Sequence, residues 1–89
     1  MAQTGNSLTS AASLTASSFD VAKQHFVDGT ANYEAGDYAQ ARISLEASLA
    51  LLPGRVSTLA NLGATLLKLG QVDAALARLN EAQIGRAHV

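Results

Sequence analysis

The sequence predicts an all-α fold in which two antiparallel helix pairs stack as a short α-α superhelix. Two observations carry this prediction. Four pairs of residues lie 34 positions apart: Gly29 and Gly63, Gly36 and Gly70, Ala41 and Ala75, and Leu45 and Leu79. Apolar residues also recur at steps of three and four from residue 21 onward, which is the spacing of one helix face. A period in this range is typical of a solenoid, whose units bury their apolar faces by stacking, so we expect function on a stacked surface.

The chain divides into three parts. Residues 1–18 are mostly Ser, Thr, Ala, Gly and Asn and lack the basic start and apolar stretch of a secretory signal, so we expect a disordered leader. Residues 19–83 carry the two repeats, as hairpins over about 22–55 and 56–83. Residues 84–89 no longer follow the repeat.

The first repeat is expected to form two helices. The first begins near Asp20, with Ser18 or Asp20 as its cap, and Gly36 stops it. Asp37 is a good N-cap for the second helix. The inward stripe of this helix, at steps of three and four, is Tyr38, Ala41, Leu45, Leu49 and Leu52. The Pro-Gly pair at 53–54 ends it.

The second repeat follows the same plan. Its first helix begins near Val56, with Ser57 as a candidate cap, and is apolar on more than one side. The large apolar residues of this helix are Leu59, Leu62, Leu66, Leu67 and Leu69. Such a helix needs neighbours on both flanks, and Gly70 closes it. The last helix carries Val72, Ala75, Leu76, Leu79 and Ala82.

The outer face of this last helix has no predicted cover within the chain. If about 300 Å² of apolar surface stays wet there, the lost stabilisation is roughly 7 kcal/mol at about 25 cal/mol per Å², which is comparable to the whole stability of a small domain. We therefore expect a chain that is marginally stable, molten or self-associating through this uncapped fourth helix.

The final six residues, 84–89, read Ile-Gly-Arg-Ala-His-Val. They match one reading frame of a widely used sequencing adapter, ATC GGA AGA GCA CAC GTC. We therefore expect a non-native tail left by read-through, and a natural protein that continues differently after Gln83. A natural frayed tail is the alternative, and the source DNA beyond the Gln83 codon separates the two.

Small residues are expected to have a packing role, because Gly29 and Gly63, with Ala41 and Ala75 opposite, let paired helix backbones approach closely. Together with the turn residues and the large apolar residues, they resemble the tetratricopeptide repeat family. The resemblance covers about residues 21–83 and rests on Gly29, Gly36, Asp37, Tyr38, Ala41, Leu45, Pro53, Leu59, Leu62, Gly63, Leu66, Gly70, Val72, Ala75, Leu79 and Ala82. It implies a right-handed solenoid of helical hairpins that binds a protein or peptide.

The first helix departs from the family's pattern. His25 and Asp28 occupy positions where the family usually has an aromatic and an aliphatic residue. This departure weakens the first helix as core. It also predicts that this face borders solvent, as expected for a first repeat with nothing stacked before it.

The resemblance further implies a concave groove lined by the first helix of each hairpin. Its candidate contacts are Lys23, Thr30, Tyr33, Asn61, Ala64 and Lys68. Lys and Asn side chains can hold a peptide's carboxylate and backbone, while Tyr33 supplies apolar area with a hydroxyl at its tip. The alternative is that the two lysines only solvate a helix face and Tyr33 is inter-repeat core. In family members that bind chaperones, a carboxylate clamp needs Lys and Asn at the positions that Phe26 and Thr30 occupy here. Only Asn61 matches the clamp, so this specialised function is disfavoured.

Charge and cysteine content exclude several other classes of function. The formal net charge is −1 and no basic run can neutralise a series of phosphates, so we expect no nucleic-acid partner. The absence of Cys excludes disulfides, thiolate metal sites and thiol nucleophiles. Apolar runs such as residues 49–52 are too short to cross a bilayer, so we expect no membrane partner.

No catalytic constellation is visible in the 89 residues. His25 and Asp28 can share a helix face, but such pairs are usually solvated, and His88 lies in the tail. The glycines lack the Lys and Ser or Thr of a phosphate loop. We therefore expect no catalytic, cofactor or metal site, and a binding module as the function. The Ala- and Leu-rich composition and the cap-and-turn chemistry suggest that this module is found in the cytoplasm of a bacterium. The alternative is the N-terminal repeat region of a larger enzyme, since residues 47–82 resemble bacterial repeat proteins fused to a methyltransferase.

Overall fold

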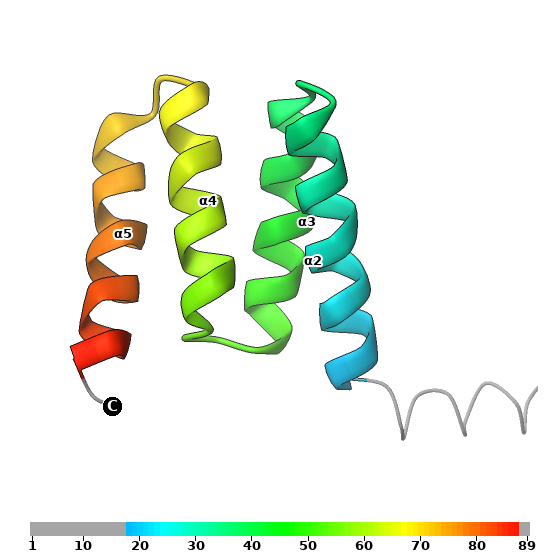
Figure 1. The fold of residues 1–89 in the computed structure, drawn as a ribbon, viewed down its shortest axis with the longest axis horizontal. Helices are drawn as coiled ribbons and strands as arrows, with labels where there is room; N and C mark the ends of the chain where they lie inside the picture. Colours follow the sequence, from blue (N-terminus) through cyan, green and yellow to red (C-terminus); the bar gives the residue numbers. More distant parts are fainter. Residues whose placement is uncertain (1–17, 88–89) are drawn as a thin grey trace, which may run out of the picture.

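The computed structural model describes residues 18–87, which form four α-helices and their connections (Figure 1). Helix α2 spans Ser18–Glu34, α3 spans Tyr38–Leu51, α4 spans Val56–Lys68 and α5 spans Val72–Ala87. The described part of the chain holds no strand, so the all-α prediction is confirmed. Most of the predicted leader, residues 1–17, lies outside the described residues, and Ser18 already belongs to α2.

The helices pack as two hairpins that lie side by side. Helix α2 packs along α3, α4 packs along α5, and the contact between α3 and α4 joins the two hairpins. Helices α2 and α4 approach each other only sparsely, and α5 packs on α4 alone among the described helices. The predicted stacking of two antiparallel helix pairs is therefore confirmed.

Each hairpin turns at a glycine whose φ is positive. Gly36 has a φ of 84° and Gly70 a φ of 78°, a region that residues with a Cβ rarely adopt. The N–H of Gly36 donates to the carbonyl of Tyr33, and the N–H of Asp37 donates to that of Asn32, which is the Schellman pattern of a helix end. The second hairpin repeats this pattern at Gly70. Both predicted helix stops are confirmed.

The caps predicted for three helices have different outcomes. Ser18 and Asp20, the caps predicted for the first helix, both lie inside α2. The side chain of Asp37 accepts a hydrogen bond from the N–H of Gln40 at 3.2 Å, so it caps α3 as predicted. The prediction that Ser57 caps α4 is wrong. Arg55 is the N-cap and makes no side-chain cap hydrogen bond. Because α4 begins at Val56, Ser57 already lies inside the first turn.

The core lies between the two hairpins. Leu45 of α3, Leu62 and Leu66 of α4 and Ala75 of α5 form one buried cluster, and Phe26 and Leu49 pack against it. Buried leucines on α4 explain why this helix needs neighbours on both flanks. Two members of the predicted set differ: Leu67 is 47% exposed, and Leu69 is half-buried as the C-cap that follows α4.

Close helix contacts occur at the same place in both repeats. A Cβ built on Gly29 would lie 2.7 Å from Cγ of Leu45, and one built on Gly63 would lie 2.6 Å from Cδ2 of Leu79. In each case the carbonyl oxygen of the opposing alanine, Ala41 or Ala75, stands 3.4 Å away. The Gly-Ala pairing predicted from the repeat is therefore present twice.

One buried hydroxyl links two helices of the first hairpin. The Oγ of Ser48 donates to the carbonyl oxygen of Ala22 at 2.7 Å, from α3 to α2. The hydroxyl of Thr65, by contrast, donates within its own helix, to the carbonyl of Asn61. The Ser48 bond therefore fixes how α2 and α3 align.

The outer side of α2 is polar. Asp28 is exposed and accepts a hydrogen bond from Nε2 of Gln24 at 3.0 Å, while His25 is half-buried. The exposure of Asp28 agrees with the expectation that this face borders solvent.

Helix α5 continues to Ala87, past the point where the repeat pattern ends. A Cβ on Gly85 would lie 2.9 Å from Cγ2 of Val56, so the end of α5 passes close to the start of α4. The foreign origin of residues 84–89 stays a prediction. The outer face of α5 leaves 58% of Leu76 exposed, together with about half of Val72.

Substituting Gly63→Ala should lower the free energy of unfolding by about 1–2 kcal/mol, because overpacking against Leu79 exceeds the helix propensity that Ala adds. Urea denaturation of single and double variants measures this. In a Leu79→Ala background, which removes the clashing atoms, the same substitution should become neutral or stabilising. An unchanged effect in both backgrounds contradicts the close-contact explanation.

Substituting Ser48→Ala should cost about 0.5–1.5 kcal/mol, the net value of one intramolecular hydrogen bond. The matched control is Ser57→Ala, since Ser57 is exposed and caps no helix. Urea midpoints of the two variants are compared with that of the parent chain. Equal midpoints for the two variants would show that the bond to Ala22 adds nothing to stability.

Candidate functional site

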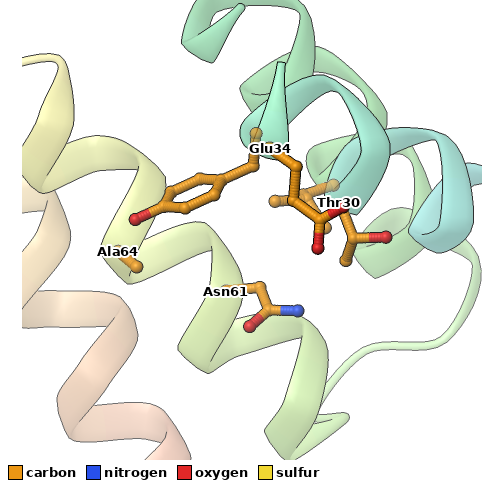
Figure 2. Close-up of a pocket in the computed structure, with 6 residues that line it drawn as sticks. Thr30, Glu34, Asn61 and Ala64 are labelled. Carbon is orange, nitrogen blue, oxygen red and sulfur yellow. The ribbon is translucent and has the colours of Figure 1, made fainter. Parts of the chain in front are cut away.

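Two cavities lie along the surface between α2 and α4. The first, which we name the Asn61 cavity, encloses about 170 Å³. Its lining residues are Thr30, Tyr33, Glu34, Leu45, Asn61 and Ala64. Figure 2 shows Thr30 and Glu34 on α2 facing Asn61 and Ala64 on α4 across the cavity.

The second cavity is larger and more apolar. We name it the Phe26 cavity, and it encloses about 310 Å³. Its lining residues are Phe19, Ala22, Lys23, Phe26, Val27, Ser48, Leu52, Arg55 and Thr58. The cavity is therefore built where the first half of α2, the end of α3 and the first turn of α4 meet.

The two cavities follow one another along the same pair of helices. The α2 residues of the Phe26 cavity lie at 19–27, and those of the Asn61 cavity at 30–34. On α4 the order is the same, from Thr58 to residues 61–64. Because residues three and four apart share one helix face, the two cavities form a single strip, which we name the α2/α4 groove.

The structure brings four of the six predicted groove residues together. Thr30, Tyr33, Asn61 and Ala64 all line the Asn61 cavity, and Lys23 lines the Phe26 cavity instead. Lys68 lines neither cavity, and its Nζ lies 5.9 Å from the ring centroid of Tyr38.

Tyr33 lines the groove and also packs inside its own hairpin. Its ring packs edge-on against Tyr38, with centroids 5.2 Å apart and planes at 69°, a favourable aromatic geometry. This contact lies within the first hairpin rather than between repeats. The half-buried side chain also lines the Asn61 cavity, so its packing holds it at the groove.

Sequence reasoning missed Glu34 and most of the Phe26 cavity. Glu34 follows Thr30 by four residues, so it lies on the same face of α2. The helical spacing could therefore have predicted it as a groove residue. Arg55 and Leu52 had no such signal, because they reach the cavity from a different helix and a loop. Their positions follow from how the hairpins pack.

The two cavities differ in charge. Glu34 is the charged residue of the Asn61 cavity, whereas Lys23 and Arg55 line the Phe26 cavity. Over residues 18–87 the ion pairs run from Arg42 to Glu46 and from Arg78 to Glu81, each within one helix. Within that range, Lys23 and Arg55 therefore have no carboxylate partner.

Two findings concern the metal and His-Asp candidates within the described residues. No group of three His, Cys, Asp or Glu side chains there is arranged to hold a metal ion. Asp28 is bound by Gln24 and not by His25, so the His-Asp pair noted in the sequence is not joined by a hydrogen bond. None of the helices within residues 18–87 is long and apolar enough to span a bilayer.

Comparison with known proteins supplies the family. No curated protein and no solved structure matches this chain significantly. The family model described as Tetratricopeptide repeat matches residues 32–84, which is more than half of the chain. That range contains both turn glycines, the Asp37 cap and the Leu cluster between the hairpins. The chain therefore belongs to the tetratricopeptide repeat family.

Proposed function

We propose that this chain is a protein-interaction module that binds an extended peptide segment in the α2/α4 groove. Tetratricopeptide repeats in general serve as protein-interaction scaffolds. The observation that carries the proposal for this chain is the Asn61 cavity, where the first helices of both repeats place polar side chains opposite one another.

The side chains of the Asn61 cavity suit a peptide backbone. The amide of Asn61 can both donate and accept a hydrogen bond, as an extended backbone requires. The hydroxyl of Thr30 already donates to the carbonyl of Val27 at 2.9 Å, which leaves its oxygen as an acceptor for a peptide N–H. Tyr33 adds an aromatic surface. Because its ring is already packed against Tyr38, little side-chain entropy is lost when a peptide binds.

Other parts of the proposal rest on sequence alone. We propose a cytoplasmic location and a bacterial source, supported by the Ala- and Leu-rich composition, and the repeat region of a larger enzyme as the alternative architecture. Under that alternative the role of the described helices is still to bind or position a partner.

Self-association through α5 is a second proposal. Its support is the exposed apolar side of α5, where Val72 and Leu76 are each more than half exposed. Burying such residues against a second copy would recover the hydrophobic stabilisation that the isolated chain lacks.

Peptides selected from a random display library should bind in the α2/α4 groove, and Asn61→Ala should weaken them about 2- to 12-fold, the value of one hydrogen bond. Amide shifts in a ¹⁵N NMR titration locate the site and give the affinity. The matched control is Asn80→Ala, because Asn80 is exposed on α5 and lines neither cavity. Peptides that bind elsewhere, or an equal effect of both variants, would refute the groove.

Substituting Leu76→Gln should weaken self-association, because it removes an apolar side chain from the exposed face of α5. Sedimentation equilibrium over a dilution series measures the dimer dissociation constant. Leu67→Gln is the control, since Leu67 is similarly exposed but lies on α4. A parent chain that stays monomeric at every concentration would overturn this proposal.

A further inference from the structure

We propose that the Phe26 cavity binds a bulky apolar side chain of the peptide that stands next to a carboxylate. This inference rests on the proposed function and names the chemistry of the partner at one end of the groove. It depends on three features of the described residues: the apolar wall of the cavity, the two cations at its rim and the uncapped start of α4.

The wall of the cavity suits an aromatic or large aliphatic side chain. Phe26 and Leu52 are half-buried there, while Phe19 is 54% exposed, so apolar surface is still available to a ligand. The volume of about 310 Å³ leaves room for a ring, since a cavity of about 150 Å³ accommodates benzene. Burial of such a side chain supplies most of the favourable binding energy.

The rim of the cavity carries positive charge without a balancing carboxylate. Lys23 lies on α2 and Arg55 precedes α4, and none of the described residues that line the cavity is acidic. The guanidinium carbon of Arg55 lies 5.5 Å from the ring centroid of Phe19, an attractive geometry that holds the cation beside the apolar wall. A ligand carboxylate at this rim can accept charge-assisted hydrogen bonds from both residues.

The start of α4 adds to this preference. At the start of α3 the side chain of Asp37 caps a backbone N–H, but Arg55 makes no such bond at the start of α4. The first N–H groups of α4 therefore have no side-chain acceptor from their cap residue, and they carry the partial positive charge of a helix N-terminus. Arg55 and Thr58 both line the cavity, so the start of α4 borders it.

The two ends of the groove then select different peptide chemistry. Glu34 at the Asn61 cavity disfavours a carboxylate, whereas Lys23 and Arg55 favour one at the Phe26 cavity. This asymmetry defines the register of a bound peptide, with its apolar and acidic residues at the start of α2.

Three short peptides with blocked ends test the inference on the full chain by ¹⁵N NMR titration. They are acetyl-Gly-Phe-Asp-Gly-amide, acetyl-Gly-Phe-Asn-Gly-amide and acetyl-Gly-Ala-Asp-Gly-amide. The Phe-Asp peptide should shift the amides of Ala22, Phe26 and Thr58, and should bind about three- to tenfold more tightly than the Phe-Asn peptide. The Ala-Asp peptide should bind more weakly still, because it leaves the cavity wall exposed to water.

Two variants assign the preference to the rim. Lys23→Gln and Arg55→Gln should each reduce the preference for Asp over Asn, while Val27→Ala, which trims the apolar wall and leaves the contact between Arg55 and Phe19 in place, should weaken both Phe peptides equally. Arg78→Gln is the matched control, since Arg78 pairs with Glu81 on α5 and lines neither cavity. It should leave the preference unchanged, and folding of every variant is checked in the same spectra.

Equal binding of the Asp and Asn peptides, shifts outside the Phe26 cavity, or no binding of the Phe-Asp peptide at millimolar concentration would each overturn the inference. If library peptides still bind at Asn61 in those cases, the proposed function stands without it. If library peptides avoid the groove altogether, the proposed function fails on its own test.

Discussion

The contact between a glycine and a leucine within each hairpin sets the geometry of the whole structure. Gly29 faces Leu45 and Gly63 faces Leu79, each so closely that a Cβ would collide with the leucine. The glycines let the leucines seat deeply between the paired helices, which determines the distance between helix axes. Both hairpins therefore share this close helix packing, and they stack on each other through α3 and α4.

The same contact connects the core to the groove. Leu45, which seats against Gly29, also belongs to the buried cluster and lines the Asn61 cavity. Since α2 and α4 approach each other only sparsely, a side chain from α3 forms the base of the space between them. The packing of the repeats therefore creates the groove. The polar residues that line it determine what it can bind.

Features that depend on neighbours in sequence were predictable. The glycine turns at 36 and 70 and the Asp37 cap follow from local backbone requirements, and the structure has all three. The prediction that Ser57 caps α4 was wrong because the sequence pattern places a helix start only to within one or two residues, and α4 already begins at Val56. The Phe26 cavity escaped prediction for another reason. It joins segments of α2, α3 and α4, and only their packing shows that Arg55 approaches Phe19.

Helix α5 stands apart from the groove. It packs on α4 alone among the described helices, and no residue of α5 lines either cavity. It still shares the buried cluster through Ala75, and Ala82 is buried, so the last turn after Ala82, rather than the whole helix, can open locally while α2, α3 and α4 keep the groove intact. A bound ligand stabilises a protein only against openings that destroy its site. Amide protons of α2, α3 and α4 would thus gain hydrogen-exchange protection from a bound peptide, whereas those of the last turn of α5 would keep the exchange rates of the free chain.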